Sequence, residues 1–193
     1  MRERAPDFRN NYLAFVDPSG GSSDSMTLAI SHSEGETQML DLIREIRPPF
    51  SPEAVVEEFA STMRRYRCSR AFGDRYGGNW PAEQFMKAQI HLEPCERTKS
   101  ELYIDLLPAV NSRAVRLLEH ERLMMQLVSL ERTTRGGGKD KVDHPRGSHD
   151  DIANAVAGAL VLCRDEVTYS PAQRLRDNMK MQAAYKLWAR SVA

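Results

Sequence analysis

Three apolar runs near the start of the chain predict a group of strands. Residues Tyr12 to Val16 form a short apolar run that ends at an Asp-Pro-Ser-Gly-Gly turn. Apolar residues resume from Ser25 to Ile30, and a third run extends from Gln38 to Ile43. Short apolar runs separated by turn residues are typical of strands that pair through hairpins. This part of the chain therefore predicts two hairpin-paired strands and a third strand after them.

A helical period follows these strands. The run Ser51-Pro52-Glu53 combines an N-cap residue, a first-turn proline and an early acid, and apolar residues then recur at helical spacing to about Tyr66. The next apolar run, from Cys68 to Gly73, has the length of a buried strand. A strand that follows such a helix is reached by a crossover, so we expect it to lie parallel within the sheet.

The middle of the chain is mostly helical in pattern and ends in a polar stretch. A helix is predicted to begin at residues 79–81 and a strand to cover residues 90–93. Helical segments should cover residues 100–133, with a break at 111–113. Residues 132–147 are polar and rich in glycine and basic side chains, which predicts a mobile loop or a hairpin.

Two further helices are predicted near the end of the chain. Residues 150–163 are rich in alanine and apolar on most sides, so this helix should be buried against the sheet. The run Ser170-Pro171-Ala172-Gln173 matches a capping box with proline at the first helical position, which predicts a helix to about residue 190. Hairpin strands followed by crossover helices predict an α/β layer architecture.

Composition and charge limit the classes of protein that this chain can represent. A length of 193 residues with 41% hydrophobic residues fits one globular domain with a substantial core. The 27 basic and 27 acidic residues cancel, so any binding of nucleic acid must use local patches. The three cysteines show no CxxC zinc pattern, and no apolar stretch fits a membrane span or a signal peptide. We therefore expect a soluble protein of the cytoplasm.

Three aspartates stand where an apolar strand ends or a helix begins, and they carry the strongest chemical signal in the chain. Asp17 follows the first strand, Asp74 follows the predicted parallel strand, and Asp151 lies with Asp150 at the start of the alanine-rich helix. Carboxylates gathered at one edge of a sheet offer hard oxygen ligands for Mg²⁺ or Mn²⁺. Two such ions can activate a water molecule and stabilise a leaving oxygen, which indicates phosphodiester hydrolysis.

Each aspartate also has a structural explanation. Asp17 and Asp74 precede glycine-containing turns, where aspartate is common because of its turn chemistry. Ser148 to Asp151 matches a capping box, with Ser148 as the N-cap and Asp151 three residues later. Because three acids would each need a separate explanation, the set as a whole favours a shared metal site.

Other polar residues near these aspartates are candidates for supporting roles. Asp24, at the start of the second strand, and Asn154, one helical turn after Asp151, are expected to assist the metal ligands. His149 has three interpretations: a ligand, a general base or a residue of the first helical turn. The polar stretch is either a solvated loop or a phosphate-binding patch, and its basic residues are Arg132, Arg135, Lys139, Lys141 and Arg146.

Three motifs together resemble the C-terminal nuclease domain of the large terminase subunit of tailed phages. They are Phe-Val-Asp17-Pro-Ser-Gly-Gly with Asp24 after it, Phe72-Gly-Asp74-Arg-Tyr-Gly-Gly-Asn-Trp, and Gly147-Ser-His-Asp-Asp151-Ile-Ala-Asn-Ala, so that the resemblance covers roughly residues 10–165. It implies an RNase H-like fold related to the RuvC resolvases, with a mixed central sheet and helices on both faces. It also implies Asp17, Asp74 and Asp151 as ligands of two Mg²⁺ or Mn²⁺ ions.

The resemblance implies an endodeoxyribonuclease that cleaves concatemeric viral DNA during genome packaging. Its partners would be double-stranded DNA, a portal protein, a small terminase subunit and an ATPase domain. The chain contains no GxxxxGK(S/T) phosphate loop, so it represents either an excised nuclease domain or a standalone protein. Residues 1–168 are expected to form the nuclease domain and residues 169–193 a helical extension.

Two points stay open within this hypothesis. The family commonly has an acid where this chain has Asn154, so either Asp150 or Asp151 could take the role of third ligand. The same residues are also compatible with a RuvC-like resolvase that cuts four-way junctions. A non-catalytic module that binds DNA or a portal is the alternative from a different functional class.

Overall fold

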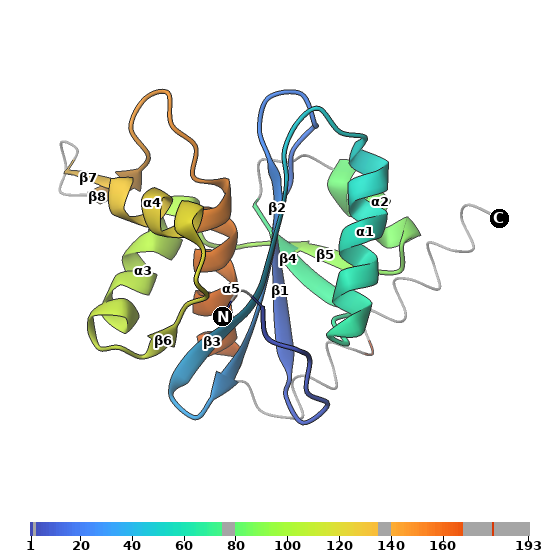
Figure 1. Ribbon diagram of the computed structural model, residues 1–193, viewed down its shortest axis with the longest axis horizontal. Helices are drawn as coiled ribbons and strands as arrows, with labels where there is room; N and C mark the ends of the chain where they lie inside the picture. The colour runs from blue at the N-terminus through green and yellow to red at the C-terminus, as the bar shows by residue number, and fades with distance from the viewer. Residues whose placement is uncertain (2, 75–79, 135–139, 168–178, 180–193) are drawn as a thin grey trace.

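A six-stranded mixed sheet with helices on both faces forms the protein, as a computed structural model shows (Figure 1). The structure describes residues 1, 3–74, 80–134, 140–167 and 179. The strand order is β5-β4-β1-β2-β3-β6. Helices α1 and α2 cover one face, and helices α3, α4 and α5 lie on the other (Figure 1). The predicted α/β architecture, with a mixed sheet between two helical layers, is therefore confirmed.

The first three strands, predicted as a hairpin pair with a third strand after it, form an antiparallel meander. They are β1 (Tyr12–Asp17), β2 (Met26–Glu34) and β3 (Thr37–Ile46). Both adjacent pairs, β1–β2 and β2–β3, run antiparallel. The register places Asp17 opposite Thr27. The last residue of β1 therefore reaches the edge of the sheet beside the start of β2.

The crossover after the meander also matches its prediction. Helix α1 (Pro52–Arg65) begins after Ser51, whose side chain accepts a hydrogen bond from the Ala54 N–H. Strand β4 (Arg70–Gly73) then pairs in parallel with β1. Helix α2 (Trp80–Lys87) leads to β5 (His91–Pro94), which is parallel to β4 at the edge of the sheet.

The segment predicted as helical over residues 100–133 is more divided than expected. Helix α3 (Lys99–Asn111) is followed by the two-residue strand β6 (Val115–Arg116), which pairs with β3, and only then by helix α4 (Glu121–Ser129). The prediction of helix beyond residue 129 was wrong, because the chain there enters a hairpin. Strands β7 (Glu131–Thr134) and β8 (Asp140–Asp143) pair antiparallel, so the hairpin interpretation of residues 132–147 is the correct one.

Helix α5 (Asp151–Val167) is the buried, alanine-rich helix that the sequence predicts. It crosses β1, β2 and β3, and it approaches β1 closely because Gly158 has no side chain. A Cβ atom added at Gly158 would lie 2.2 Å from the Cδ2 atom of Phe15, so the helix rests directly on that aromatic ring. The final helix predicted for residues 170–190 falls outside the described residues, apart from residue 179.

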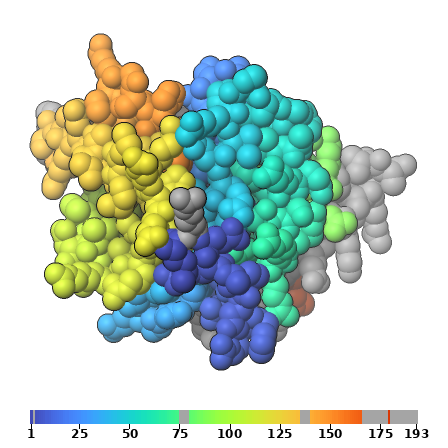
Figure 2. Space-filling model, in the orientation of Figure 1, coloured from blue at the N-terminus to red at the C-terminus, as the bar shows by residue number. Residues whose placement is uncertain are grey.

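Two hydrophobic cores hold these layers together, one on each face of the sheet. The core under α5 includes Phe15, Ala29 and Leu40, and the core under α1 includes Val16, Leu28 and Phe59. The first residues of the chain, dark blue in Figure 2, lie on the surface between α4 and α1. All three cysteines are buried, and they form no disulfide among the described residues. Within the described ranges, no helix combines the length and apolar character needed to cross a bilayer.

Candidate functional site

The parallel pairing of β1 and β4 brings two of the predicted aspartates to one edge of the sheet. Val16 lies beside Gly73 in the register, so Asp17 and Asp74 follow at the same level of two adjacent strands. Both side chains are half-buried and line the same cleft. A parallel pair places both carboxyl ends at one edge, which is where α/β folds collect functional groups. The convergence expected from the sequence is therefore present for this pair.

The start of helix α5 brings the third aspartate to the same edge. Asp151 is the first residue of the helix, and Asn154 lies one turn later. The Asn154 side chain makes a hydrogen bond with Asp17, and Asp151 accepts one from the Ser25 backbone N–H. These bonds connect the helix to β1 and to the start of β2. The close contact between Gly158 and Phe15 fixes how far the helix stands from the sheet.

These residues line one open cleft with a volume of about 690 Å³. Most of the predicted site residues are on its surface: Asp17, Asp24, Asp74, His149, Asp150, Asp151 and Asn154. In Figure 1 the loop after β1 and the loop before α5 stand near each other at the top of the molecule. The His149 Nδ1 atom lies 3.4 Å from an Asp24 carboxylate oxygen, and both side chains are exposed at the rim. His149 precedes the helix, so it is not a residue of the first helical turn.

The electrostatics of the cleft favour binding of a cation. Burial raises the pKa of Asp17 well above its ordinary value, against the effect of the Asn154 hydrogen bond, and the nearby carboxylates of Asp151, Asp74 and Asp150 raise it further. Burial also raises the pKa of Asp151. Acids that raise one another's pKa are costly to ionise together without a positive charge among them. A divalent cation would provide that charge.

Two oxygen atoms in the cleft fit the role of metal ligand or of partner to a bound water. The Asp151 Oδ2 atom and the Asn154 Oδ1 atom are buried and have no hydrogen-bond partner among the described residues. Buried polar atoms are almost always paired with protein, water or an ion. Hard oxygen donors of this kind suit Mg²⁺ and Mn²⁺. The donor set around Asp17 therefore fits the metal that the sequence predicts.

Asp150 has a different environment from its neighbour Asp151. Its side chain is almost fully buried and accepts a hydrogen bond of 2.8 Å from the Tyr103 hydroxyl. The Lys99 ammonium lies 3.1 Å from Asp150 Oδ2 and 3.2 Å from Oδ1. Both oxygens thus have partners from helix α3. The two aspartates therefore differ in their partners, and the sequence alone could not distinguish between them as third ligand.

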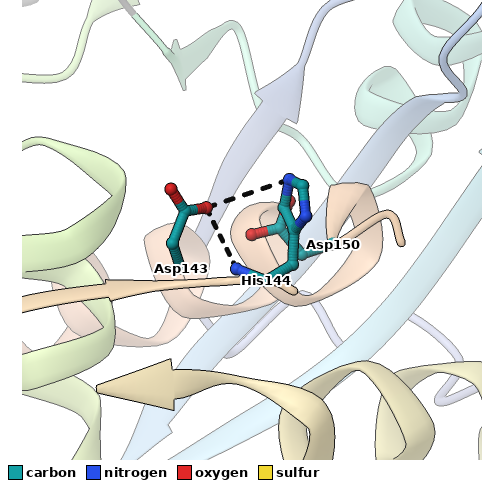
Figure 3. Close-up of side chains that lie close together, drawn as sticks. All are labelled: Asp143, His144 and Asp150. Atoms are coloured by element: carbon teal, nitrogen blue, oxygen red, sulfur yellow. Dashed lines mark hydrogen bonds and ion pairs between the residues drawn. The ribbon is translucent and has the colours of Figure 1, made fainter. Parts of the chain in front are cut away.

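A second group of potential ligands lies beside Asp150. Asp143 and His144, at the end of β8, and Asp150, before α5, each offer one ligand atom, and these atoms lie within 4.8 Å of one another. In Figure 3 dashed lines connect one Asp143 oxygen to the ring and to the backbone nitrogen of His144. The Lys99 ammonium, however, lies 3.2 Å from an Asp143 oxygen as well as near Asp150. A cation of the protein itself therefore already contacts both acids.

The capping box predicted at residues 148–151 is wrong. The Ser148 hydroxyl donates to the Pro145 carbonyl at 2.7 Å, so it does not cap the helix. The helix begins at Asp151, which is two residues too late for Ser148 to serve as N-cap. Instead, the Gln126 side-chain oxygen of α4 accepts a hydrogen bond of 2.9 Å from the Ala153 N–H. The structural explanation for Asp151 therefore loses its main support.

The basic residues of the hairpin are paired with acids and stand apart from the carboxylates. Arg132 forms an ion pair with Asp140, and the Lys141 ammonium lies 2.5 Å from Asp143. Arg146 is exposed in the loop that follows. The other two predicted DNA-binding residues, Arg135 and Lys139, lie outside the described residues. Of the described residues that line the cleft, none belongs to this basic set.

Three side chains that shape the site were not predicted. Lys99 and Tyr103 hold Asp150 from helix α3, and Gln126 holds the first turn of α5 from α4. The Thr98 to Glu101 capping box marks the start of α3 in the sequence and so gives the position of Lys99 in its first turn. No local pattern connects Lys99 to Asp150, which follows it by 51 residues, since the contact depends on the tertiary fold.

Comparisons with known proteins agree on the fold. No protein-family model and no curated protein matches the sequence. The structure superposes on the large terminase nuclease of the thermophilic phage G20c with a TM-score of 0.70 and 15% identity, covering 86% of this chain and 87% of that one. For the nuclease domain of the large terminase subunit gp2 of bacterial virus Sf6 the TM-score is 0.59, with 13% identity, covering 89% and 90%.

A longer protein shows the same similarity over part of its length. The large terminase of bacteriophage HK97 matches with a TM-score of 0.65 and 14% identity, covering 83% of this chain and 41% of that chain. The fold is therefore that of the large terminase nuclease domains, as the three sequence motifs implied.

Proposed function

We propose that this chain is a metal-dependent DNA endonuclease that cleaves concatemeric viral DNA during genome packaging. The observation that carries the proposal is the meeting of Asp17, Asp74 and Asp151 in one cleft of a fold shared with large terminase nucleases. The G20c nuclease has been solved with bound cobalt and with bound magnesium. An Sf6 nuclease structure contains manganese. These structures support Mg²⁺ or Mn²⁺ as the cofactor here.

Asp17, Asp74 and Asp151 are the residues that would hold the metal. Two bound ions would supply an activated water and stabilisation of the leaving oxygen, which is the chemistry of two-metal phosphodiester hydrolysis. Of the adjacent aspartates Asp150 and Asp151, we assign the third ligand to Asp151. Its Oδ2 atom has no partner among the described residues, whereas Asp150 is held by Lys99 and Tyr103.

The remaining residues of the cleft position these carboxylates. Asn154 fixes the orientation of the Asp17 carboxylate through their hydrogen bond, and the Ser25 N–H does the same for Asp151. Asp24 and His149 lie at the exposed rim, where they can meet a substrate or assist the ligands.

DNA contacts are assigned to the hairpin and the loop after it. Arg132, Lys141 and Arg146 are described there, and Arg135 and Lys139 belong to the same basic stretch of the sequence. Arg132 and Lys141 face acids in the free protein, so phosphates would exchange with those acids on binding. Double-stranded DNA is the proposed substrate.

The wider assembly is part of the same proposal. An ATPase domain is a proposed partner of this unit, and the match to 41% of the HK97 large terminase leaves room in that protein for a further domain. A portal protein and a small terminase subunit are the other proposed partners, and the host cytoplasm is the proposed location. Within the chain, residues 1–168 are assigned to the nuclease and residues 169–193 to an extension that contacts another subunit.

The test is cleavage of supercoiled plasmid by the purified chain in Mg²⁺, Mn²⁺ or EDTA. We expect cutting that needs the metal and that disappears in the Asp74→Asn variant. Asp105→Asn is the matched control, because Asp105 is an exposed acid of α3 paired with Arg97. Metal-dependent cutting that survives Asp74→Asn would reject the site, and absence of cutting in every condition would favour a binding module. A strong preference for four-way junctions over linear DNA would favour a resolvase.

A further inference from the structure

Helix α3 places one ammonium group between two acids beside the cleft. The Lys99 Nζ atom lies 3.1 Å from Asp150 and 3.2 Å from Asp143, which belong to the start of α5 and the end of β8. The Tyr103 hydroxyl, one turn along α3, donates to the same Asp150 carboxylate. The Ser100 hydroxyl, next to Lys99, accepts a hydrogen bond of 2.9 Å from the Val142 backbone N–H. Helix α3 is therefore joined to β8 by a hydrogen bond as well as by an ion pair.

Without the Lys99 ammonium, the acids and the histidine around it would be suitable ligands for a metal cation. Asp143, His144 and Asp150 offer two carboxylate oxygens and one imidazole nitrogen within 4.8 Å of one another (Figure 3). The His144 Nε2 atom lies 3.8 Å from Asp143 and 3.7 Å from Asp150. Mixed oxygen and imidazole donors suit first-row divalent ions such as Mn²⁺. Lys99 therefore contacts the two acids that a metal ion would need.

We propose that Lys99 is a positioning residue whose ammonium serves as a fixed internal cation, withholding Asp150 and Asp143 from metal binding so that Asp151 is the acid of α5 that faces the metal. The inference rests on the proposed nuclease function and concerns the same cleft. It goes beyond that function, because it assigns a role to a side chain outside the three aspartates and predicts a latent metal site.

The charge state of the group supports this role. Burial alone would lower the pKa of Lys99, but Asp150 and Asp143 outweigh it, so the pKa is raised and the ammonium stays charged. Burial would raise the pKa of Asp143, but Lys141 and Lys99 bring it down to about 2, so this acid is ionised across the useful pH range. Lys99 and Asp143 are therefore both charged over the useful pH range, and their ion pair does not depend on pH there.

The position of the ammonium also explains why two adjacent aspartates can have separate roles. Asp150 and Asp151 are consecutive residues. A metal ion bound at Asp143 could therefore attract both of their carboxylates. A fixed cation on the α3 side satisfies Asp150, and the peptide then directs Asp151 toward Asp17 and Ser25. Loss of the fixed cation would offer a divalent ion a second place to bind.

The test counts bound Mn²⁺ ions, which does not depend on cleavage. The full chain is titrated with Mn²⁺, and the free ion is followed by its electron paramagnetic resonance signal. Lys99→Met removes the charge and keeps the apolar stem, and Lys99→Arg keeps a cation. We expect Lys99→Met to bind one more Mn²⁺ per chain than wild type, Lys99→Arg to bind the same number as wild type, and Lys99→Met/Asp150→Asn to lose the additional ion.

An unchanged number of bound ions in folded Lys99→Met would overturn the inference. If circular dichroism shows that Lys99→Met does not fold, Lys99→Gln is used in its place with the same expectation, because its polar amide suits the site but carries no positive charge to balance Asp150 and Asp143. Failure of the proposed function looks different: wild type would neither cleave DNA nor bind Mn²⁺, while the difference between wild type and Lys99→Met would still decide the role of Lys99.

Discussion

The acids at the two ends of the central sheet have opposite kinds of charged neighbour. Where β1 ends, Asp17 lies among other carboxylates, and Asp151, Asp74 and Asp150 act together with burial to raise its pKa. Where β1 begins, Asp41 of β3 is 1% exposed and lies 2.7 Å from the Nδ1 atom of His32, which is 3% exposed. Burial raises the pKa of Asp41 as well, but the His32 hydrogen bond opposes it.

The difference separates an acid that has a histidine as its partner from an acid that lies among other carboxylates. At the Asp41 end the neighbours are a histidine and the N-terminal segment, which donates its Arg4 N–H to the Asp41 carbonyl. At the Asp17 end the nearest charged neighbours include several acids, and the protein supplies only part of the positive charge that they need. Where the negative charge of several acids is only partly neutralised in the free protein, a bound cation can neutralise the rest.

The most direct test of this comparison is to replace Asp17 and Asp41, one at a time, by asparagine. Asp17→Asn should lower metal-dependent cleavage on the order of 10³-fold or more, because it removes a ligand from the charged centre of the reaction. The same change should raise the melting temperature of the metal-free protein by relieving repulsion among the acids. Plasmid cleavage and thermal melts in EDTA measure the two effects.

Asp41→Asn is the matched variant at the other end of the sheet. It should lower stability by about 1–3 kcal/mol through loss of the charged hydrogen bond with His32, and leave cleavage close to wild type. If both amides changed stability in the same direction, the two ends would not differ as described.

A second test addresses the distance between α5 and the sheet. Gly158→Ala places a Cβ atom against the Phe15 ring, so the helix must move and stability should fall by about 1–3 kcal/mol. Cleavage should fall with it, since Asp151 and Asn154 move with the helix. The control is Gly158→Ala/Phe15→Leu, in which the smaller side chain makes room. Melts and cleavage that stay at the Gly158→Ala level in this double variant would show that the contact is not the cause.

A third test uses pH. Burial and the neighbouring acids raise the folded-state pKa of Asp17, so the folded chain binds more protons than the unfolded chain between the ordinary aspartate pKa and the raised value. The stability from this group is fully present below the ordinary pKa and is lost as pH rises through the raised one, at up to about 1.4 kcal/mol per pH unit.

The measurement is a series of melts in EDTA at increasing pH. The stability of wild type relative to Asp17→Asn should decline as pH rises, and added Mg²⁺ should restore it most at the higher pH values. Asp105→Asn serves as the control with no such trend. A difference between wild type and Asp17→Asn that stays constant with pH would contradict the predicted linkage.

The smallest effect is expected at the first turn of α5. Gln126→Ala removes the acceptor of the Ala153 N–H and should cost about 1 kcal/mol, with a modest loss of cleavage. Gln84→Ala on α2 is the matched control, because its side chain bonds only to an exposed lysine among the described residues. Equal melting temperatures for the two variants would show that Gln126 does not hold the helix.

Local patterns in the sequence predicted most of the fold. The apolar runs of β1, β2 and β3 and the cap at Ser51 are signals carried by neighbouring residues, and the structure confirms them. Strand β6 escaped prediction because two residues, Val115 and Arg116, are too few to show a period. The end of α4 was placed too late because the residues of β7 lack the apolar alternation of a buried strand.

The site was predictable only in part, for a physical reason. Asp17, Asp74 and Asp151 could be found because each follows a strand or opens a helix, and parallel strands end at one edge. The different surroundings of Asp150 and Asp151 could not be predicted in this way. They depend on Lys99 and Tyr103, which precede Asp150 by 51 and 47 residues and reach it only through the packing of α3 on α5.

The contact between Gly158 and Phe15 has a consequence for the spacing of the cleft. A helix that rests on an aromatic ring has its height above the sheet set by a flat, rigid group that can neither branch nor compress. The distance between the carboxylate of β1 and the carboxylate of α5 therefore depends on the size of one phenyl ring, that of Phe15.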